Sequence, residues 1–232
     1  MKIFIPIKDN SQRAPRKNFR SFAGEPLYKH ALLKYSQFEV YVDTDSQEIV
    51  DGILSDDRLA HVSVYRRSSD LIGDEISVCR LIKHFISKFN IQDTVAQLHV
   101  TSPFLSSETI KKAGELVGVG EYDSVVACTK YNSRFWKIES YGPCPVNHNP
   151  LRLEQTQDLP SLYEENSAFY IFHPEVPIQT NGRIGQNPYF FTLQYPENID
   201  IDTEDDWNLV KSMKRHIKNE NVMATNSISY NN

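Results

Sequence analysis

Short apolar runs alternate with amphipathic segments along most of the chain. The apolar runs, rich in β-branched and aromatic residues, predict strands at residues 3–7, 40–42, 62–65, 95–100 and 124–128. The segments between them carry an apolar residue every three or four positions, as expected of helices that pack one face on a sheet. Strand and helix in regular alternation imply parallel strands joined by right-handed crossovers. The pattern therefore predicts an α/β fold with a mainly parallel sheet flanked by helices.

This alternation stops near residue 130. Residues 130–160 contain four prolines and scattered aromatic residues without a clear period, so we expect an arm inserted at about residues 130–165. Strand patterns return at residues 167–172 and 189–193, and a last helix is predicted along Trp207, Val210 and Met213. Residues 1–218 are thus expected to form one domain. The polar residues 219–232 are expected to form a flexible tail.

The length, charge and apolar content of the chain argue against several classes of function. A chain of 232 residues can bury a substantial core as one domain. A net charge of -5 argues against a surface built to bind nucleic acid. No apolar run approaches the roughly 20 residues of a membrane span, and the N-terminus lacks a signal-peptide core. We therefore expect a cytoplasmic protein without a membrane or nucleic-acid partner.

A basic loop follows the first predicted strand. In open α/β sheets ligands bind at the carboxyl ends of the strands, which is where this loop begins. Positive charge and neutral hydrogen-bonding groups are interleaved in it: Lys8, Arg13, Arg16, Lys17 and Arg20, with Asn10, Ser11 and Asn18. This composition suits a polyphosphate, although such a loop is often only a solvated surface. Asp9 is expected to shape the loop, because an unpaired carboxylate beside phosphates would be repelled.

Two aspartate pairs are candidate metal ligands. Asp200 and Asp202 alternate in an extended segment, so both carboxylates should point to the same side. Two such oxygen ligands suit Mg²⁺, which keeps its other positions for water and phosphate. Asp43 and Asp45 form a second candidate pair, which composition alone does not exclude. Helix capping is the alternative interpretation for either pair, and the favoured one for Asp45.

Several motifs occur in the order seen in one known family. Residues 5–18 and 22–27 resemble the first motif of the CMP-sugar synthetases, the acylneuraminate cytidylyltransferases. The resemblance extends over about residues 1–215. Further matching positions are residues 42–46, Arg66, Asp74 with Ser77, residues 101–103, residues 165–171, Phe190 with Phe191, and residues 199–204.

The resemblance implies a Rossmann-like fold of the nucleotide-diphospho-sugar transferase type with a small inserted dimerisation arm. It implies that the anomeric hydroxyl of a 2-keto-3-deoxy sugar acid, sialic acid or a related nonulosonic acid, attacks the α-phosphorus of CTP and releases pyrophosphate. Mg²⁺ would be the cofactor, and a homodimer would place partner residues near the sugar.

The resemblance also assigns roles to residues of this chain. Lys8, Arg13, Lys17 and Asp202 would be catalytic, and Asp200 with Asp202 would bind the metal. CTP would contact Lys8, Asn10, Ser11, Arg13, Lys17, Asn18, Arg66 and Ser77. The sugar would contact His99, Thr101, Ser102, Lys137, Tyr170, Phe190 and Phe191. Phe190 and Phe191 alternate along a strand, so at least one of them is expected in the core.

Departures from the family pattern leave two matters open. The family usually has Arg at Lys8, Gly-Gly at Asp9-Asn10, Lys at Gln12, Gln-Pro at His99-Val100 and often Arg at Leu105. Glu154 and Gln155 lie about where some members carry a sugar-contacting Arg. These departures leave open which acid is used and whether the enzyme is weakened. Two other hypotheses are a glycosyltransferase that uses Asp43 and Asp45 for its metal, and a nucleotide-binding paralogue without turnover.

Overall fold

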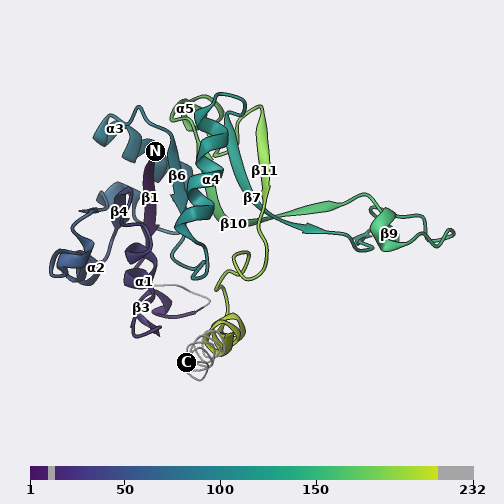
Figure 1. Ribbon diagram of the computed structural model, residues 1–232, viewed down its shortest axis with the longest axis horizontal. Helices are drawn as coiled ribbons and strands as arrows, with labels where there is room; N and C mark the ends of the chain where they lie inside the picture. The colour runs from purple at the N-terminus through teal and green to yellow at the C-terminus, as the bar shows by residue number, and fades with distance from the viewer. Residues whose placement is uncertain (10–13, 214–232) are drawn as a thin grey trace, which may run out of the picture.

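A seven-stranded sheet forms the centre of the molecule. The computed structural model describes residues 1–9 and 14–213. The strands lie in the order β11-β7-β10-β6-β1-β4-β5 (Figure 1). They are β1 (Lys2–Ile7), β4 (Glu39–Thr44), β5 (Val62–Arg66), β6 (Val95–Leu98), β7 (Ser124–Tyr131), β10 (Leu162–Phe172) and β11 (Pro188–Thr192).

Most neighbouring strands are parallel. β1 pairs in parallel with β4 and β6, β4 with β5, and β7 with β11. β10 is the exception, because it is antiparallel to both β6 and β7. The predicted α/β fold with a mainly parallel sheet is therefore confirmed, with one antiparallel strand inserted in its middle.

Helices cover both faces of the sheet. Ile3, Ile5 and Ile7 face a core formed with α1 (Leu27–Leu33), α2 (Gln47–Leu54) and α4 (Ser107–Gly118). Phe4, between them in β1, points to the other face and stacks on Phe85 of α3 (Val78–Phe89) at 4.7 Å between ring centroids. α5 (Glu175–Thr180) packs beside α3 on that face. The alternation of side chains along the buried strand thus sends apolar groups to both layers.

The helix caps agree with the sequence only in part. Ser106 caps α4 by accepting a hydrogen bond of 3.1 Å from the backbone N–H of Thr109. Ser46 is the N-cap residue of α2 but makes no side-chain cap bond. Asp45, the residue expected to cap this helix, accepts a hydrogen bond of 2.8 Å from the backbone N–H of Asp9. The capping prediction for Asp45 is therefore wrong, because its carboxylate holds the basic loop.

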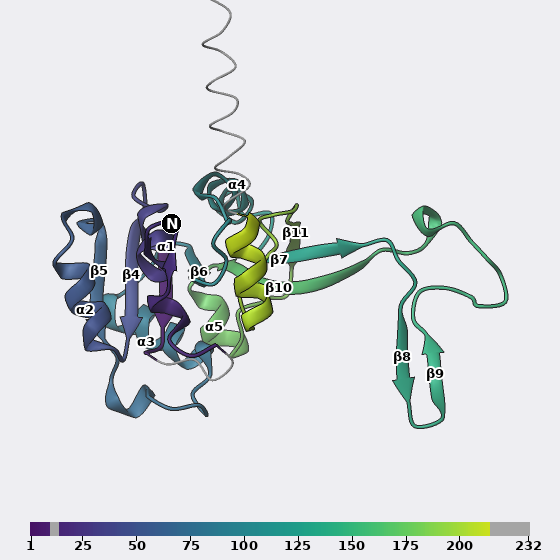
Figure 2. The ribbon, with the colours of Figure 1, turned by 90° about the horizontal axis from the view of Figure 1, so that it is seen from below.

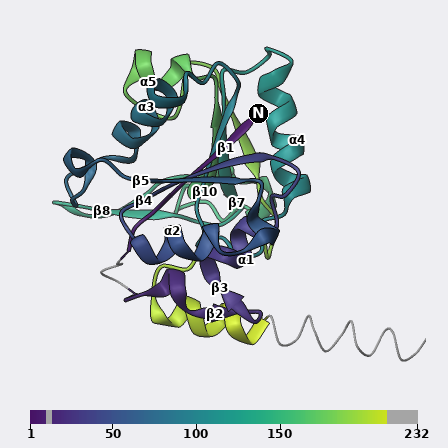
Figure 3. The ribbon, with the colours of Figure 1, turned by 90° about the vertical axis from the view of Figure 1, so that its left-hand side faces the viewer.

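A small hairpin brings the end of the described chain beside its beginning. β2 (Ser21–Phe22) and β3 (Glu25–Pro26) pair through a turn with positive φ at Ala23 and Gly24. Residues 204–213 are helical and lie beside this hairpin (Figure 3). The two parts share a buried apolar cluster of Phe22, Leu27, Ile201, Trp207 and Val210. Residues 200–202 are thereby held next to the segment that follows β1.

The chain between β7 and β10 forms a projecting arm. β7 and β10 continue beyond the sheet, and the chain between them forms the hairpin of β8 (Trp136–Glu139) and β9 (Gly142–Pro145) (Figures 1 and 2). Asn147 holds the arm together, because its amide nitrogen donates to the carbonyls of Ser133 and Pro160 at 2.8 and 3.0 Å. Exposed apolar side chains are numerous along it: Trp136, Ile138, Tyr141, Leu151 and Leu153.

The arm comprises the chain between the end of β7 at Tyr131 and the start of β10 at Leu162. The predicted boundaries of the domain and of its insertion stay predictions, as does a role of the arm in dimerisation. The predicted tail, residues 219–232, and the last residues of the predicted domain lie outside the described part of the chain. Within residues 1–9 and 14–213, no helix combines the length and apolar character needed to span a bilayer.

Candidate active site

A cleft of about 680 Å³ opens where β1 and β6 end. The chain leaves β1 towards β4 on one side and returns to β6 on the other, so the cleft lies at the switch point of the sheet. Ligands of open α/β sheets bind at such points. Its lining comes from segments far apart in sequence: Pro6, Ile7, Lys8, Lys17, Asn18, Asp74, Val78, His99, Val100, Thr101, Ser167, Arg183, Asp200 and Asp202.

One end of the cleft is built from the segment after β1. Asn18 is buried and donates a 2.8 Å hydrogen bond to the carbonyl of Lys8, which fixes the loop. Its amide oxygen is buried and has no hydrogen-bond partner among the described residues. Lys8 forms an ion pair of 3.1 Å with Asp74. Four loop residues, including the predicted CTP ligands Asn10, Ser11 and Arg13, lie outside the described residues.

Asp9 does not line the cleft. Its carboxylate accepts a 2.5 Å hydrogen bond from the hydroxyl of Ser46, and its backbone N–H donates to Asp45. These two bonds tie the basic loop to the start of α2. The prediction that Asp9 shapes the loop is therefore confirmed.

Asp200 and Asp202 both line the cleft, in agreement with the prediction that their carboxylates point to the same side. Ile201 between them is fully buried, and its N–H donates a 2.9 Å hydrogen bond to the carbonyl of Thr101. Lys17 donates a 2.7 Å hydrogen bond to the carbonyl of Ile201 and lies 3.6 Å from the carboxylate of Asp202. Burial raises the pKa of Asp200, and the negative charge of Asp202 adds to the effect. Burial and mutual repulsion thus disfavour the charged form of this carboxylate pair, and a bound cation would offset both effects.

The two carboxylates suit Mg²⁺ better than a metal ion whose ligands all come from the protein. No group of three or more His, Cys, Asp or Glu side chains in residues 1–9 and 14–213 is arranged to hold a metal ion. Mg²⁺ typically takes one or two carboxylates and completes its octahedron with water and substrate phosphates. Asp200 and Asp202, facing the basic end of one cleft, offer this arrangement.

The second aspartate pair is not available to a metal. Asp43 is fully buried, and its carboxylate forms an ion pair with the guanidinium of Arg67, which is also enclosed. Asp45 is engaged by the N–H of Asp9. The neighbouring Arg66 is exposed at the end of the edge strand β5 and does not line the cleft. Ser77, the exposed N-cap residue of α3, precedes the cleft residue Val78.

The other end of the cleft lies over β6 and β10. β10 bulges between Glu165 and Tyr170, and Ser167 within the bulge adopts a positive φ of 60° that brings it to the cleft wall. Tyr170 is buried, with its hydroxyl bonded to Glu165 and 3.2 Å from the hydroxyl of Ser167. Burial raises the pKa of Tyr170 to about 12. The guanidinium of Arg183 lies 3.6 Å from the centroid of the Tyr170 ring.

His99 lies between the two ends. Its Nε2 is 2.8 Å from the amide nitrogen of Gln97, whose oxygen accepts from Arg183. An amide nitrogen only donates, so Nε2 accepts and the imidazole is neutral. Burial, together with the positive charges of Arg183 and Lys17, lowers the pKa of His99 to about 4. Thr101 also lines the cleft, and the hydroxyl of Ser102 lies 3.5 Å from the carboxylate of Asp200.

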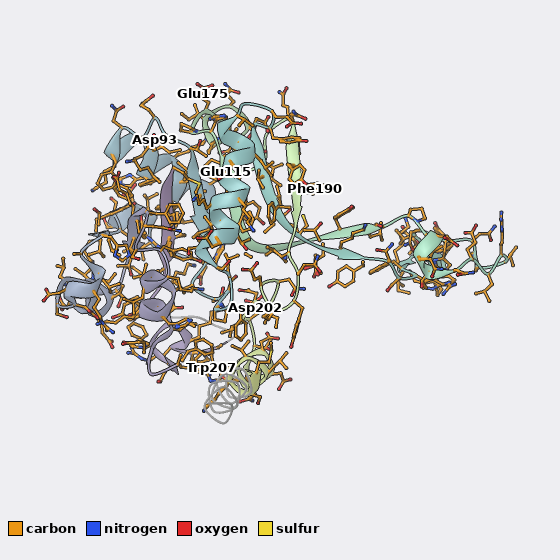
Figure 4. All side chains as sticks on the ribbon, viewed as in Figure 1. Asp93, Glu115, Glu175, Phe190, Asp202 and Trp207 are labelled. Atoms are coloured by element: carbon orange, nitrogen blue, oxygen red, sulfur yellow. The ribbon has the colours of Figure 1, made fainter. Side chains whose placement is uncertain are left out.

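Of the predicted sugar-binding residues, His99 and Thr101 line the cleft, whereas five do not within one chain: Ser102, Lys137, Tyr170, Phe190 and Phe191. Lys137 lies on the arm, 59% exposed, and pairs with Glu139. Phe190 is exposed on β11 near Tyr163, whereas Phe191 packs on Phe169 and the core, as expected for one of the two. Figure 4 shows Phe190 on β11, apart from Asp202. Sequence patterns miss Arg183, because it lies in a loop without periodicity or a recognised motif.

The fold and the cleft define an α/β protein in which two carboxylates and two lysines, Lys8 and Lys17, line one cleft at the switch point of a mainly parallel sheet. Residues 3–223 match the family described as Cytidylyltransferase, and the chain belongs to this family.

Named relatives agree with this family. The chain is 31% identical over 228 residues to the CMP-N,N'-diacetyllegionaminic acid synthase of Legionella pneumophila, covering 90% of this chain and 94% of the relative. It is 29% identical to N-acylneuraminate cytidylyltransferase A of Danio rerio over 211 residues, which cover 88% of this chain and 48% of the relative. The chain thus spans about half the length of that relative.

The fold is shared with a solved structure of CMP:2-keto-3-deoxy-manno-octonic acid synthetase in complex with CTP. The superposition gives a TM-score of 0.62 at 13% sequence identity and covers 92% of this chain and 98% of that chain. At this identity the likeness concerns the fold alone.

Proposed function

We propose that the protein is a CTP-dependent cytidylyltransferase that activates a 2-keto-3-deoxy sugar acid, sialic acid or a related nonulosonic acid. The products would be the CMP-sugar and pyrophosphate. The observation that carries the proposal is the convergence of Lys17, Asp200 and Asp202 in one cleft at the switch point of the sheet. The family and the names of the relatives support the choice of nucleotide and acceptor.

The nucleotide would occupy the end of the cleft formed after β1. Lys8 and Lys17, with Arg13 of the same loop, would bind the triphosphate, and the free amide oxygen of Asn18 would accept a hydrogen bond from the nucleotide. Lys8 would exchange its present partner Asp74 for a phosphate. Arg66 and Ser77, which lie outside the cleft, would contact the cytosine or ribose only if the loops carrying them approach it.

The reaction is a displacement at phosphorus. The anomeric hydroxyl of the acid attacks the α-phosphorus and loses its proton, and the bond to the bridging oxygen of pyrophosphate breaks. Mg²⁺ held by Asp200 and Asp202 would supply positive charge for the phosphoryl oxygens and the leaving group. Lys17, fixed between Ile201 and Asp202, would add a positioned cation at the same place.

The acceptor would lie over β6 and β10. His99, Thr101, Ser102 and Tyr170 would form this end, with Ser102 and Tyr170 acting through the groups they hold. Lys137 is on the arm, so we propose that it enters the cleft of a partner copy in a homodimer. Phe190 lies at the base of the arm beside Tyr163 and would border the same junction. A cytoplasmic location follows from the proposed use of CTP.

A pyrophosphate-release screen tests the proposal. The four nucleoside triphosphates are each combined with a panel of 2-keto-3-deoxy sugar acids, with and without Mg²⁺. Release is expected with CTP alone among the nucleotides, and only when both an acid and Mg²⁺ are present. A rise in thermal stability with CTP but no turnover with any acid would instead support a nucleotide-binding paralogue.

A further inference from the structure

Arg183 is the one arginine that lines the cleft among the described residues. It lies between α5 and β11, after a turn at Asn181 with positive φ. Its side chain is 19% exposed, so the guanidinium is mostly withdrawn from solvent but open to the cleft. Arg183 therefore places a positive charge where a molecule bound in the cleft could contact it.

The guanidinium is held in place by two groups. Its Nη1 donates a 2.7 Å hydrogen bond to the side-chain oxygen of Gln97, and its central carbon lies over the ring of Tyr170. Gln97 and Tyr170 are directly opposite each other in the pairing of β6 with β10. Both anchors therefore belong to the rigid sheet, and the orientation of the guanidinium does not depend on its own loop alone.

These anchors leave most of the binding capacity of Arg183 unused. A guanidinium has five N–H donors, and Gln97 takes one of them. Among the described residues its one carboxylate partner is Glu165, which forms a long ion pair of 4.0 Å with Nη2, beyond hydrogen-bond distance, and accepts a hydrogen bond from Tyr170. Arg67 shows the contrasting case, because it is enclosed and paired directly with Asp43. The guanidinium of Arg183 can thus still bind a ligand, whereas the charge of Arg67 is neutralised by Asp43 in the core.

The position of Arg183 separates it from the phosphate-binding cations. Lys8 and Lys17 follow β1, whereas Arg183 is anchored on β6 and β10. His99, the other basic residue at this end, is neutral because its Nε2 accepts from Gln97. Arg183 is therefore the cation that the described residues provide where the acceptor would lie.

We propose that Arg183 binds the carboxylate of the sugar-acid substrate and so selects acids over neutral sugars. The inference rests on the proposed function. A carboxylate presents two oxygens in the geometry of the guanidinium fork, and such charge-assisted pairs are among the stronger hydrogen bonds of proteins. Tyr170 and Gln97 act as positioning residues, since they hold the guanidinium without contacting the carboxylate.

The experiment compares the acid that supports turnover in the screen with its C1 amide, which has a similar shape without the charge. In the unmodified enzyme the acid should be favoured in kcat/KM by about 10- to 100-fold, the value of a charged hydrogen-bonded pair. In Arg183→Met the KM for the acid should rise by a similar factor, and the preference for acid over amide should fall to within about threefold. An intrinsic effect of the amide on reactivity would be common to both enzymes, so the decisive quantity is the change in the acid-to-amide preference between the unmodified enzyme and Arg183→Met.

Three controls separate this role from a loss of structure. The KM for CTP and the melting temperature of Arg183→Met should stay close to those of the unmodified enzyme. Arg183→Lys, which keeps the charge but loses the fork, should recover part of the preference. Arg80→Met, a matched change at an exposed position of α3 outside the cleft, should leave both ratios unchanged.

The outcomes are distinguishable. An undiminished acid preference in folded Arg183→Met would overturn the assignment of Arg183 and leave the proposed function standing. Absence of turnover by the unmodified enzyme with every acid would overturn the proposed function, and this inference with it.

Discussion

Lys17 lies 3.6 Å from the carboxylate of Asp202 and donates a hydrogen bond to the carbonyl of Ile201 next to it. One residue belongs to the segment after the first strand and the other to the last described part of the chain. Their contact depends on the apolar cluster that packs Trp207 and Ile201 on Phe22 and Leu27. The fold therefore brings the segment after β1 and the carboxylate pair together in one cleft.

Replacing Asp200 with Asn should separate the function of this pair from its effect on stability. The pKa of Asp200 is raised by burial and by Asp202, so the fold favours its neutral form. The stability that this provides is complete at acid pH and is lost as the pH rises through the raised pKa, which leaves the ionised group destabilising at pH 7. Asp200→Asn should therefore melt at or above the temperature of the unmodified protein without metal, and its turnover should fall by about 100-fold or more.

The effect of Mg²⁺ on the melting temperature tests whether Asp200 is a metal ligand. The metal should raise the melting temperature of the unmodified protein, by mass action on the folded state, and have little effect on Asp200→Asn. Asp205→Asn, an exposed carboxylate on the adjoining helix, should retain the full response. Equal responses of Asp200→Asn and the unmodified protein to Mg²⁺ would show that Asp200 is not a ligand.

His99 should make folding sensitive to mild acid. Its pKa falls from 6.5 to about 4 in the folded protein, through burial and the nearby charges of Arg183 and Lys17, with Asp202 acting in the opposite direction. Between these values the unfolded chain binds a proton that the folded chain does not, so stability rises with pH across this window and is complete above it. The contribution is at most about 3 kcal/mol.

The test compares the unmodified protein with His99→Gln by urea unfolding at pH 4.5 and pH 7.5. The unmodified protein should lose more stability on acidification than the variant, because Gln does not titrate. A parallel loss in both proteins would mean that His99 is free to take up a proton in the folded state, and that its hydrogen bond from Gln97 does not hold it neutral.

The buried pair of Asp43 and Arg67 should behave as a structural element. Asp43→Asn leaves the charge of Arg67 enclosed without a counter-charge, which costs about 3–5 kcal/mol of unfolding free energy. Glu48→Gln breaks the exposed pair with Arg16 and should cost less than about 1 kcal/mol. Turnover per folded molecule should survive in Asp43→Asn. Loss of turnover in a fully folded Asp43→Asn protein would revive the hypothesis of a metal site at Asp43 and Asp45.

Sequence periodicity predicts the helices and parallel strands well, because each has an apolar face whose spacing is visible in the residue order. The direction of β10 is not visible in this way. Residues 168–172 are buried on both faces, and such a run has the same pattern whether the strand is parallel or antiparallel. The place of β10 between β6 and β7 depends on long-range pairing, which only the folded chain specifies.

For the candidate site, too, the sequence predicts some features and not others. The alternation of Asp200 and Asp202 around Ile201 is sufficient to predict that both carboxylates lie on the same side of the chain, whereas only the structure shows that this side faces the cleft. Composition does not distinguish Arg66 from Arg67, although one is exposed and the other is enclosed with Asp43. Arg183 has no sequence signal, because its role depends on Gln97 and Tyr170 being opposite each other on strands that are distant in sequence.

The arm provides the last prediction. Ile138 on β8 is 79% exposed, and Leu151 and Leu153 are exposed still further, so the arm presents apolar groups that a single chain leaves in water. We expect a second copy to cover them, because an apolar surface of this kind marks an interaction site. Ile138→Glu should then shift the protein from dimer to monomer in analytical ultracentrifugation, with little change in melting temperature. This follows because the arm lies apart from the core of the sheet (Figure 2).

Leu54→Glu is the matched control. Leu54 is 71% exposed at the end of α2, which packs on β4 and β5 at the edge of the sheet away from the arm, so the same change of charge there should leave the dimer intact. If Lys137 enters the cleft of the partner, the monomeric Ile138→Glu protein should also lose turnover while it still binds CTP, because its own cleft then lacks the lysine that a second arm would supply. A fully active monomer would contradict the proposed contribution of Lys137 to a partner's cleft.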